Sequence, residues 1–186
     1  GRAQGNSLNT LLDAFELTGE KRYIVKAEKL IRKHISPSDD IDKLNKQQIE
    51  LRWFYLIFLQ SVGKYLDIKD AIAGRDEMFF YAKESLLYHA KWMLENEAPY
   101  KKLFHIVEIP SSTWPAQDIR KSAIFDYAYK YSDEDLKALF REKAEYFYNS
   151  SINDVLSFKD GSAAFVRPLA VLMHYGVMHT YFQSLD

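Results

Sequence analysis

The chain has 186 residues, of which 47% are hydrophobic and 27% charged, with 25 Lys and Arg against 26 Asp and Glu. This composition excludes a disordered chain, because low hydrophobicity and high net charge are both missing. A formal net charge of -1 argues against a dedicated nucleic-acid binder, which needs an excess of Lys and Arg to displace counterions. The lack of cysteine excludes a disulfide scaffold, a thiolate zinc site and a Cys nucleophile.

The first elements predicted along the chain are two amphipathic helices. Apolar residues recur at helical spacing from Leu8 to Phe15, and Gly19 follows as a left-handed cap. A second apolar face begins almost at once, at Tyr23, and continues to Ile31. The two helices are therefore expected to form a tight αα-hairpin.

Long helices are expected over the rest of the chain as well, because glycine and proline are sparse. We expect five more, with an irregular segment at 96–113: 47–66, 76–95, 115–131, 132–156 with Ser132 as its cap, and one that begins at Pro168. No segment alternates with the period of a strand. The segment 168–182 is the most apolar, but it is too short to span a bilayer. The sequence therefore predicts an all-α protein of about seven helices in consecutive antiparallel αα-hairpins.

Three of the expected helices share a small residue in a similar setting, namely Ala27, Ala82 and Ala144, each beside Lys and Glu. One alanine in each hairpin is typical of a repeat whose helices approach closely. The alternative is that alanine with Lys and Glu is simply good helix chemistry.

The segment QGNSLNTLLDAFELTGEKRY, residues 4–23, resembles a hairpin of the (α/α) toroid, or six-hairpin, carbohydrate-active proteins. Similar openings and turns occur in the helical domains of glucuronyl C5-epimerases and in unsaturated glucuronyl hydrolases. The resemblance implies that residues 1–186 form a single αα-hairpin domain, a fragment from the C-terminal half of a larger toroid. An open helical domain of the epimerase sort is the alternative.

The resemblance also implies where a ligand would lie. In such toroids the ligand lies at the end that carries the N-termini of the inner helices, so the segments before these helices would converge on one rim. The expected substrate-binding residues are Arg2, Gln4, Asn6, Arg52, Trp114, Gln117, Arg120 and Arg167. They suit a sugar acid, because arginine binds carboxylates in bidentate fashion and tryptophan offers an apolar face to a pyranose ring.

The expected catalytic residues are Asp118, Glu50 and His105. Hydrolysis of a glycoside needs two carboxylates across the scissile bond, so Asp118 requires a partner such as Glu50, Glu108 or a residue outside this fragment. His105 is a candidate general acid or base. Structural roles are the alternative for each residue. In particular, Asp118 in a first helical turn complements the helix dipole.

No cofactor and no metal are expected. His105 and Glu108 form the only His/Glu cluster in a loop, and they lack further ligands nearby. His174 and His179 are five residues apart, so they do not share a helix face.

The expected function is therefore a toroid domain that binds an acidic poly- or oligosaccharide, with hydrolase, lyase or epimerase activity left open. The alternative is a non-enzymatic helical repeat module that binds a protein partner or forms a homo-oligomer. The sequence indicates no compartment. Trp114 is expected to lie partly exposed in a concavity at the rim, with Gln117, Asp118 and Arg120 in the adjoining helical turns. The competing outcome is that Trp114 is a core residue whose indole N–H bonds a loop carbonyl.

Overall fold

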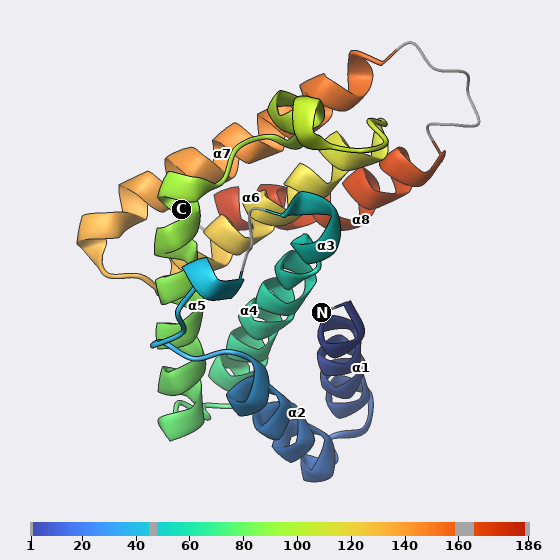
Figure 1. The fold of residues 1–186 in the computed structure, drawn as a ribbon. Coiled ribbons are helices and arrows are strands. Elements are labelled where there is room, and N and C mark those ends of the chain that lie inside the picture. Colours follow the sequence, from blue (N-terminus) through green and yellow to red (C-terminus); the bar gives the residue numbers. More distant parts are fainter. Residues whose placement is uncertain (1, 45–47, 159–165, 185–186) are drawn as a thin grey trace. The chain divides into compact units, whose positions relative to one another are not determined.

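A computed structural model describes residues 2–44, 48–158 and 166–184, and within them it contains helices and no strand. The prediction of an all-α protein is confirmed. The elements are α1 (Arg2–Thr18), α2 (Lys21–His34), η1 (Asp42–Leu44), α3 (Ile49–Arg52), α4 (Tyr55–Ala71), α5 (Glu77–Asn96), η2 (Tyr100–Ile106), α6 (Thr113–Tyr131), α7 (Glu134–Leu156) and α8 (Val166–Gln183), where η denotes a 3-10 helix (Figure 1). None of the helices in these ranges is long and apolar enough to cross a membrane.

The chain divides into two compact units, the first ending at Met93 and the second beginning at Leu94. Each unit is described by itself below. The single domain and the toroid arrangement that the sequence suggests stay predictions.

In the first unit, α1 and α2 form the predicted hairpin (Figure 1). Gly19 between them has a φ of +68°, and its N–H donates to the Phe15 carbonyl at 2.8 Å, as expected of a left-handed helix cap. The apolar stripes of both helices face inward, since Leu8, Leu12 and Ile31 are fully buried. Burial of these stripes is the main free-energy gain that holds the hairpin together.

The packing of α1 on α4 depends on a glycine. A Cβ atom at Gly5 would lie 2.8 Å from Ile57 Cγ2 and 2.9 Å from the Phe58 backbone nitrogen. At the same point, the Ser61 hydroxyl donates to the Gly5 carbonyl at 3.2 Å. Only glycine permits this approach of the two helices. The sequence places residues 2–6 before the first helix, which is wrong because α1 already begins at Arg2.

The expected continuous helix over 47–66 is also wrong, since a corner at Trp53 and Phe54 separates α3 from α4. Its expected start, Gln47, lies outside the described residues. At the corner, Leu56 N–H donates to the Trp53 carbonyl at 3.2 Å and Ile57 N–H to the Phe54 carbonyl at 3.1 Å. These tighter bonds let the chain turn without leaving donors unpaired. Beyond the corner α4 is buried on nearly all sides, as its apolar sequence predicts.

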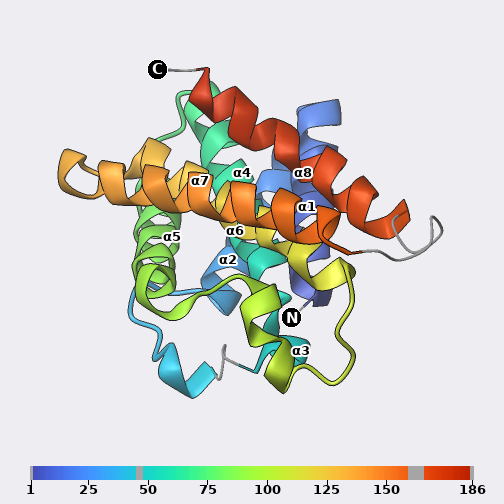
Figure 2. The ribbon, with the colours of Figure 1, turned by 90° about the horizontal axis from the view of Figure 1, so that it is seen from above.

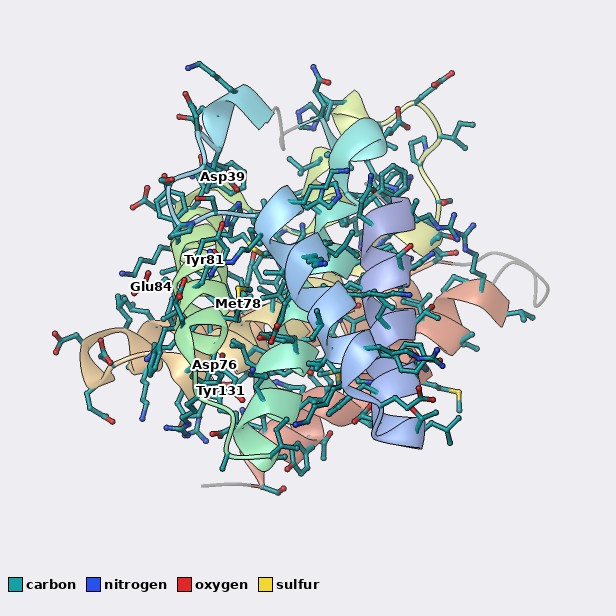
Figure 3. The ribbon with its side chains drawn as sticks, turned by 90° about the horizontal axis from the view of Figure 1, so that it is seen from below. Asp39, Asp76, Met78, Tyr81, Glu84 and Tyr131 are labelled. Atoms are coloured by element: carbon teal, nitrogen blue, oxygen red, sulfur yellow. The ribbon has the colours of Figure 1, made fainter. Side chains whose placement is uncertain are left out.

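Hydrogen bonds attach α5 to the chain that follows α2. Tyr81 donates its hydroxyl to the Ile35 carbonyl at 2.8 Å, and Tyr88 donates to the Asp39 carbonyl at 3.0 Å. Figure 3 shows Asp76 at the start of α5, with Tyr81 further along this helix and Asp39 beside it. Asp76 Oδ1 accepts the Phe79 N–H at 3.0 Å and so caps the helix.

In the second unit, α7 and α8 both pack against α6, the most deeply buried helix (Figure 2). Pro115 is the third residue of α6 and not the first as expected; the same holds for Pro168 in α8. Either position is compatible with a helix, because the first turn has no intrahelical partner for its N–H groups. Asp133, not the expected Ser132, occupies the N-cap of α7.

The three alanines of the suggested repeat, Ala27, Ala82 and Ala144, are all fully buried. They lie on α2, α5 and α7, as the sequence predicts. A small buried residue on each of these helices agrees with close helix packing.

Substitution of Gly5 by alanine tests the approach of α1 to α4. We expect Gly5→Ala to lower the free energy of unfolding by about 1–3 kcal/mol, because the added methyl group meets the backbone of α4. The matched control is Gly176→Ala in α8, where the nearest atom to an added Cβ is Tyr148 Cε2 at an ordinary 3.8 Å. There we expect a gain of about 0.5–1 kcal/mol from helix propensity. Urea denaturation measures both, and equal effects of the two variants would contradict the role given to Gly5.

Candidate functional site

Asp118, the strongest candidate for catalysis in the sequence, lies inside the second unit. Its exposed fraction is 0%. The carboxylate oxygen Oδ2 accepts the Tyr100 backbone N–H at 2.9 Å, and Oδ1 forms an ion pair with Lys121 Nζ at 2.9 Å. The first turns of α6 thus direct this carboxylate toward η2 and the chain that leads into it.

Lys121, one turn further along α6, is equally buried. Its ammonium lies 2.8 Å from Glu97 Oε2 and donates to the Ala98 carbonyl at 2.6 Å. The same nitrogen is 3.6 Å from the centre of the Tyr100 ring, a cation–π contact. An ammonium has three protons, and here two carboxylates and a carbonyl surround it. We call Glu97, Asp118 and Lys121 the buried ionic cluster.

The pKa values of Asp118 and Lys121 are both raised in this cluster. Burial raises the pKa of Asp118 to about 7, even though Lys121 and the Tyr100 N–H oppose the shift. Burial alone would lower the pKa of Lys121, but the charges of Asp118 and Glu97 outweigh it and raise that pKa. Lys121 therefore stays charged, while Asp118 exchanges its proton near neutral pH.

The other polar residues of this segment bind one another. Gln117 Oε1 accepts the Arg120 Nε–H at 2.7 Å, and the Arg120 guanidinium lies 4.0 Å from the centre of the Tyr175 ring of α8. Both side chains are less than a tenth exposed. In this conformation they fasten α8 to α6, and the role in substrate binding that the sequence suggests for them stays a prediction.

Trp114 combines features of both expected outcomes. It is half-buried, while its indole N–H donates to the Ile109 carbonyl at 3.1 Å. Its ring meets the Tyr100 ring edge to face, with 5.5 Å between the centres. Part of the indole is thus held in a fixed orientation at the surface of the second unit.

The remaining candidates are spread over both units. Arg2, Asn6, His105 and Arg167 are exposed and Gln4 and Glu50 are half-buried, whereas the side chain of Arg52 lies outside the described part of the chain. Arg2, Gln4, Asn6 and Glu50 belong to the first unit, and His105 and Arg167 to the second. Their convergence on one rim stays a prediction. Across the described ranges, no group of three or more His, Asp or Glu side chains is placed to hold a metal.

A set of residues that the sequence reasoning missed lies on α2. Arg22, Lys26, Lys29 and Lys33 are all exposed and follow one another at spacings of four, three and four, so they share one helix face. We call these four residues the cationic stripe. The signal was present in the segment KRYIVKAEKLIRKH, which has a single acidic residue, but the near-zero charge of the whole chain conceals it.

Helix stability does not account for the stripe. The helix dipole favours Lys33 in the last turn of α2 but disfavours Arg22 in the first turn, where the ion pair with Glu20 at the N-cap offsets part of the cost. Each of the three neighbouring like-charged pairs destabilises the helix by about 0.2–0.5 kcal/mol. The like-charge repulsion along the stripe therefore opposes helix formation.

Little within the protein neutralises this charge. Arg22 pairs with Glu20 at 2.8 Å, but Lys26, Lys29 and Lys33 form no ion pair with a residue of the described ranges. Burial and then the charge of Lys33 lower the pKa of His34. The opposite face of α2 is apolar and buried, so the helix presents its charged side to solvent.

No protein-family model, no curated protein and no solved structure was found to match the chain. The resemblance of residues 4–23 to toroid proteins stays a prediction.

Removal of the buried ammonium tests whether the ionic cluster is structural. We expect Lys121→Met to lower the free energy of unfolding by about 3–5 kcal/mol, because two carboxylates then lose their buried counterion. The control is Lys143→Met on α7, a half-buried lysine outside the cluster. Urea denaturation measures the free energy of unfolding of both variants. A loss for Lys121→Met no larger than that of the control would contradict the assignment.

The raised pKa of Asp118 predicts a pH dependence of stability. The folded-state pKa is about 7 and the reference value 3.8, so the folded state keeps a proton that the unfolded chain releases. The free energy of unfolding of the wild type minus that of Asp118→Asn should therefore fall as the pH rises from about 4 to about 7. This difference should level off above that range. Urea denaturation at several pH values measures this difference. Asp135→Asn, which removes an exposed carboxylate of α7, is the control, and a difference that rises with pH would refute the shift.

Proposed function

We propose that this protein binds an acidic polysaccharide and that the cationic stripe of α2 is the surface that holds it. The observation that carries the proposal is the line of four exposed cations, three of them without an ion pair among the described residues. The proposal keeps the substrate class suggested by the sequence but moves the binding surface from the segment around Asp118 to α2.

The spacing of the stripe suits an extended polyanion. Successive members are about one helical turn apart, and the stripe runs over residues 22–33, roughly 16 Å along the helix axis. A single glycan chain carries its carboxylates at intervals, so each can face one cation. Arg22 adds a planar guanidinium, which binds carboxylates in bidentate fashion.

Two other polyanionic surfaces suit this face less well. Duplex DNA presents a charge about every 1.7 Å along its axis, on two strands, and calls for a broad basic surface, whereas this chain has a net charge of -1. A membrane-binding amphipathic helix inserts its apolar face into the bilayer. The apolar face of α2, formed by Ile24, Ala27 and Ile31, is already buried inside the protein. Nucleic acid and anionic vesicles are therefore controls in the test.

The proposal is limited to binding. Glycoside hydrolysis requires two carboxylates that reach the substrate, and the favoured candidate, Asp118, is fully buried beside Lys121. Among the described residues, no second carboxylate has been found opposite Asp118 across a space for substrate.

The test is a calorimetric titration of the protein with polygalacturonate oligosaccharides at low salt. We expect the triple variant Lys26→Gln, Lys29→Gln and Lys33→Gln to bind at least tenfold more weakly, because each lost contact removes a charge-assisted interaction. The dependence of affinity on salt should also flatten, by up to about 0.7 in log–log slope per lost contact, the value for single-stranded nucleic acids. The matched control is Lys43→Gln, Lys91→Gln and Lys143→Gln, which changes the net charge equally but outside the stripe.

Three outcomes would contradict the proposal. The first is that neither wild type nor control binds the oligosaccharide, and the second is that both triple variants lose affinity equally. The third is a preference for DNA or anionic vesicles over the glycan at matched charge and salt. Trp114→Ala distinguishes the two candidate surfaces, because it should leave binding on α2 unchanged and abolish binding at the segment first suggested by the sequence.

A further inference from the structure

The helix α8 exposes a continuous line of large apolar side chains. They lie three or four residues apart and are between 44% and 75% exposed, and we call them the apolar stripe of α8: Val166, Leu169, Met173, Val177 and Tyr181. The line extends over residues 166–181, roughly 22 Å along the helix axis. Monomeric proteins rarely leave such a contiguous apolar surface to solvent unless it binds something.

The opposite side of α8 is held firmly in the second unit. His179 Nδ1 lies 3.0 Å from Asp126 Oδ1 on α6, and the His179 ring stacks on Tyr148 of α7 with 4.4 Å between the centres. Phe182 meets the Tyr127 ring edge to face. The side of α8 that packs on α6 and α7 is thus opposite the apolar stripe, and the stripe is the outer face of the helix.

The pattern of the stripe is self-complementary. Leu169, Met173, Val177 and Tyr181 are evenly spaced by four residues, so a two-fold axis at the level of Tyr175 maps these four residues of the stripe onto one another. Around that axis a second, antiparallel α8 would place its Val177 opposite Met173 and its Tyr181 opposite Leu169. Such a matched surface is what an isologous dimer interface requires.

Charge also permits a second copy. The only Arg or Lys of α8 is Arg167, and the helix has no Asp or Glu. In the antiparallel arrangement Arg167 faces the partner's Gln183, so no like charges meet. A parallel pair would instead bring the two Arg167 side chains together.

We propose that the apolar stripe of α8 binds the same stripe of a second copy of the chain, antiparallel, with Met173 against the partner's Val177. This inference is independent of the proposed glycan binding, which concerns α2. The four side chains of each copy that meet across the axis together offer on the order of 1,000 Å² of surface to bury, the lower end of specific interfaces, so the dimer should be reversible at micromolar concentration.

The test is sedimentation equilibrium over a range of concentrations. We expect wild type to shift from monomer to dimer, and Met173→Glu and Val177→Lys each to remain monomeric, because each buries a charge against an apolar side chain. Leu139→Glu, at a similarly exposed leucine of α7 outside the stripe, should dimerise as wild type does. Circular dichroism confirms that every variant is folded.

Mixing the two monomeric variants tests the register. The introduced glutamate at 173 should face the introduced lysine at 177 of the other chain, so Met173→Glu and Val177→Lys together should form a heterodimer that neither forms alone. A wild type that stays monomeric at the highest concentration overturns the proposal. So does a dimer that survives Met173→Glu, or a mixture of the two variants that fails to associate.

Discussion

The second unit is organised around a buried charge, the ammonium of Lys121. A charged group inside a protein is tolerated only with counterions and hydrogen bonds around it. Glu97 and Asp118 at 2.8 and 2.9 Å, and the Ala98 carbonyl at 2.6 Å, meet that requirement. Because Glu97 and Ala98 belong to the chain before η2, this segment must return to α6, and the Tyr100 ring and its N–H then complete the cluster.

The helices were predictable wherever an apolar stripe is interrupted by polar residues, as in α2 or α7. The corner at Trp53 and Phe54 was not, because the sequence around it is apolar nearly all round and carries no periodic signal to mark a change of direction. The role of Gly5 was equally hidden. It arises from the approach of Ile57 and Phe58, more than fifty residues away in sequence, and no local pattern reports such a contact.

For the candidate site, residue types indicated chemistry but not burial. Trp114, Gln117, Asp118 and Arg120 are the side chains that a glycan site would use, yet three of them are satisfied inside the protein. One signal could have been read, since Asp118 and Lys121 stand three residues apart on a helix and such pairs commonly interact. The cationic stripe was missed for a different reason. Net charge was counted over the whole chain, where acidic residues elsewhere cancel the basic residues of α2.

The two surfaces proposed for binding share a physical property, which is that folding alone does not favour either of them. Repulsion in the three like-charged pairs along α2 opposes the helix by about 1 kcal/mol in total, and the apolar stripe of α8 leaves unburied much of the surface whose removal from water drives folding. A sequence shaped only by stability would place acids between the lysines and polar groups at Met173 and Val177. Residues that lower stability while remaining exposed are therefore better explained by what they bind than by the fold. The stripes lie on helices of different units and differ in chemistry, so the proposed polyanion and the proposed second copy of the chain would contact different residues.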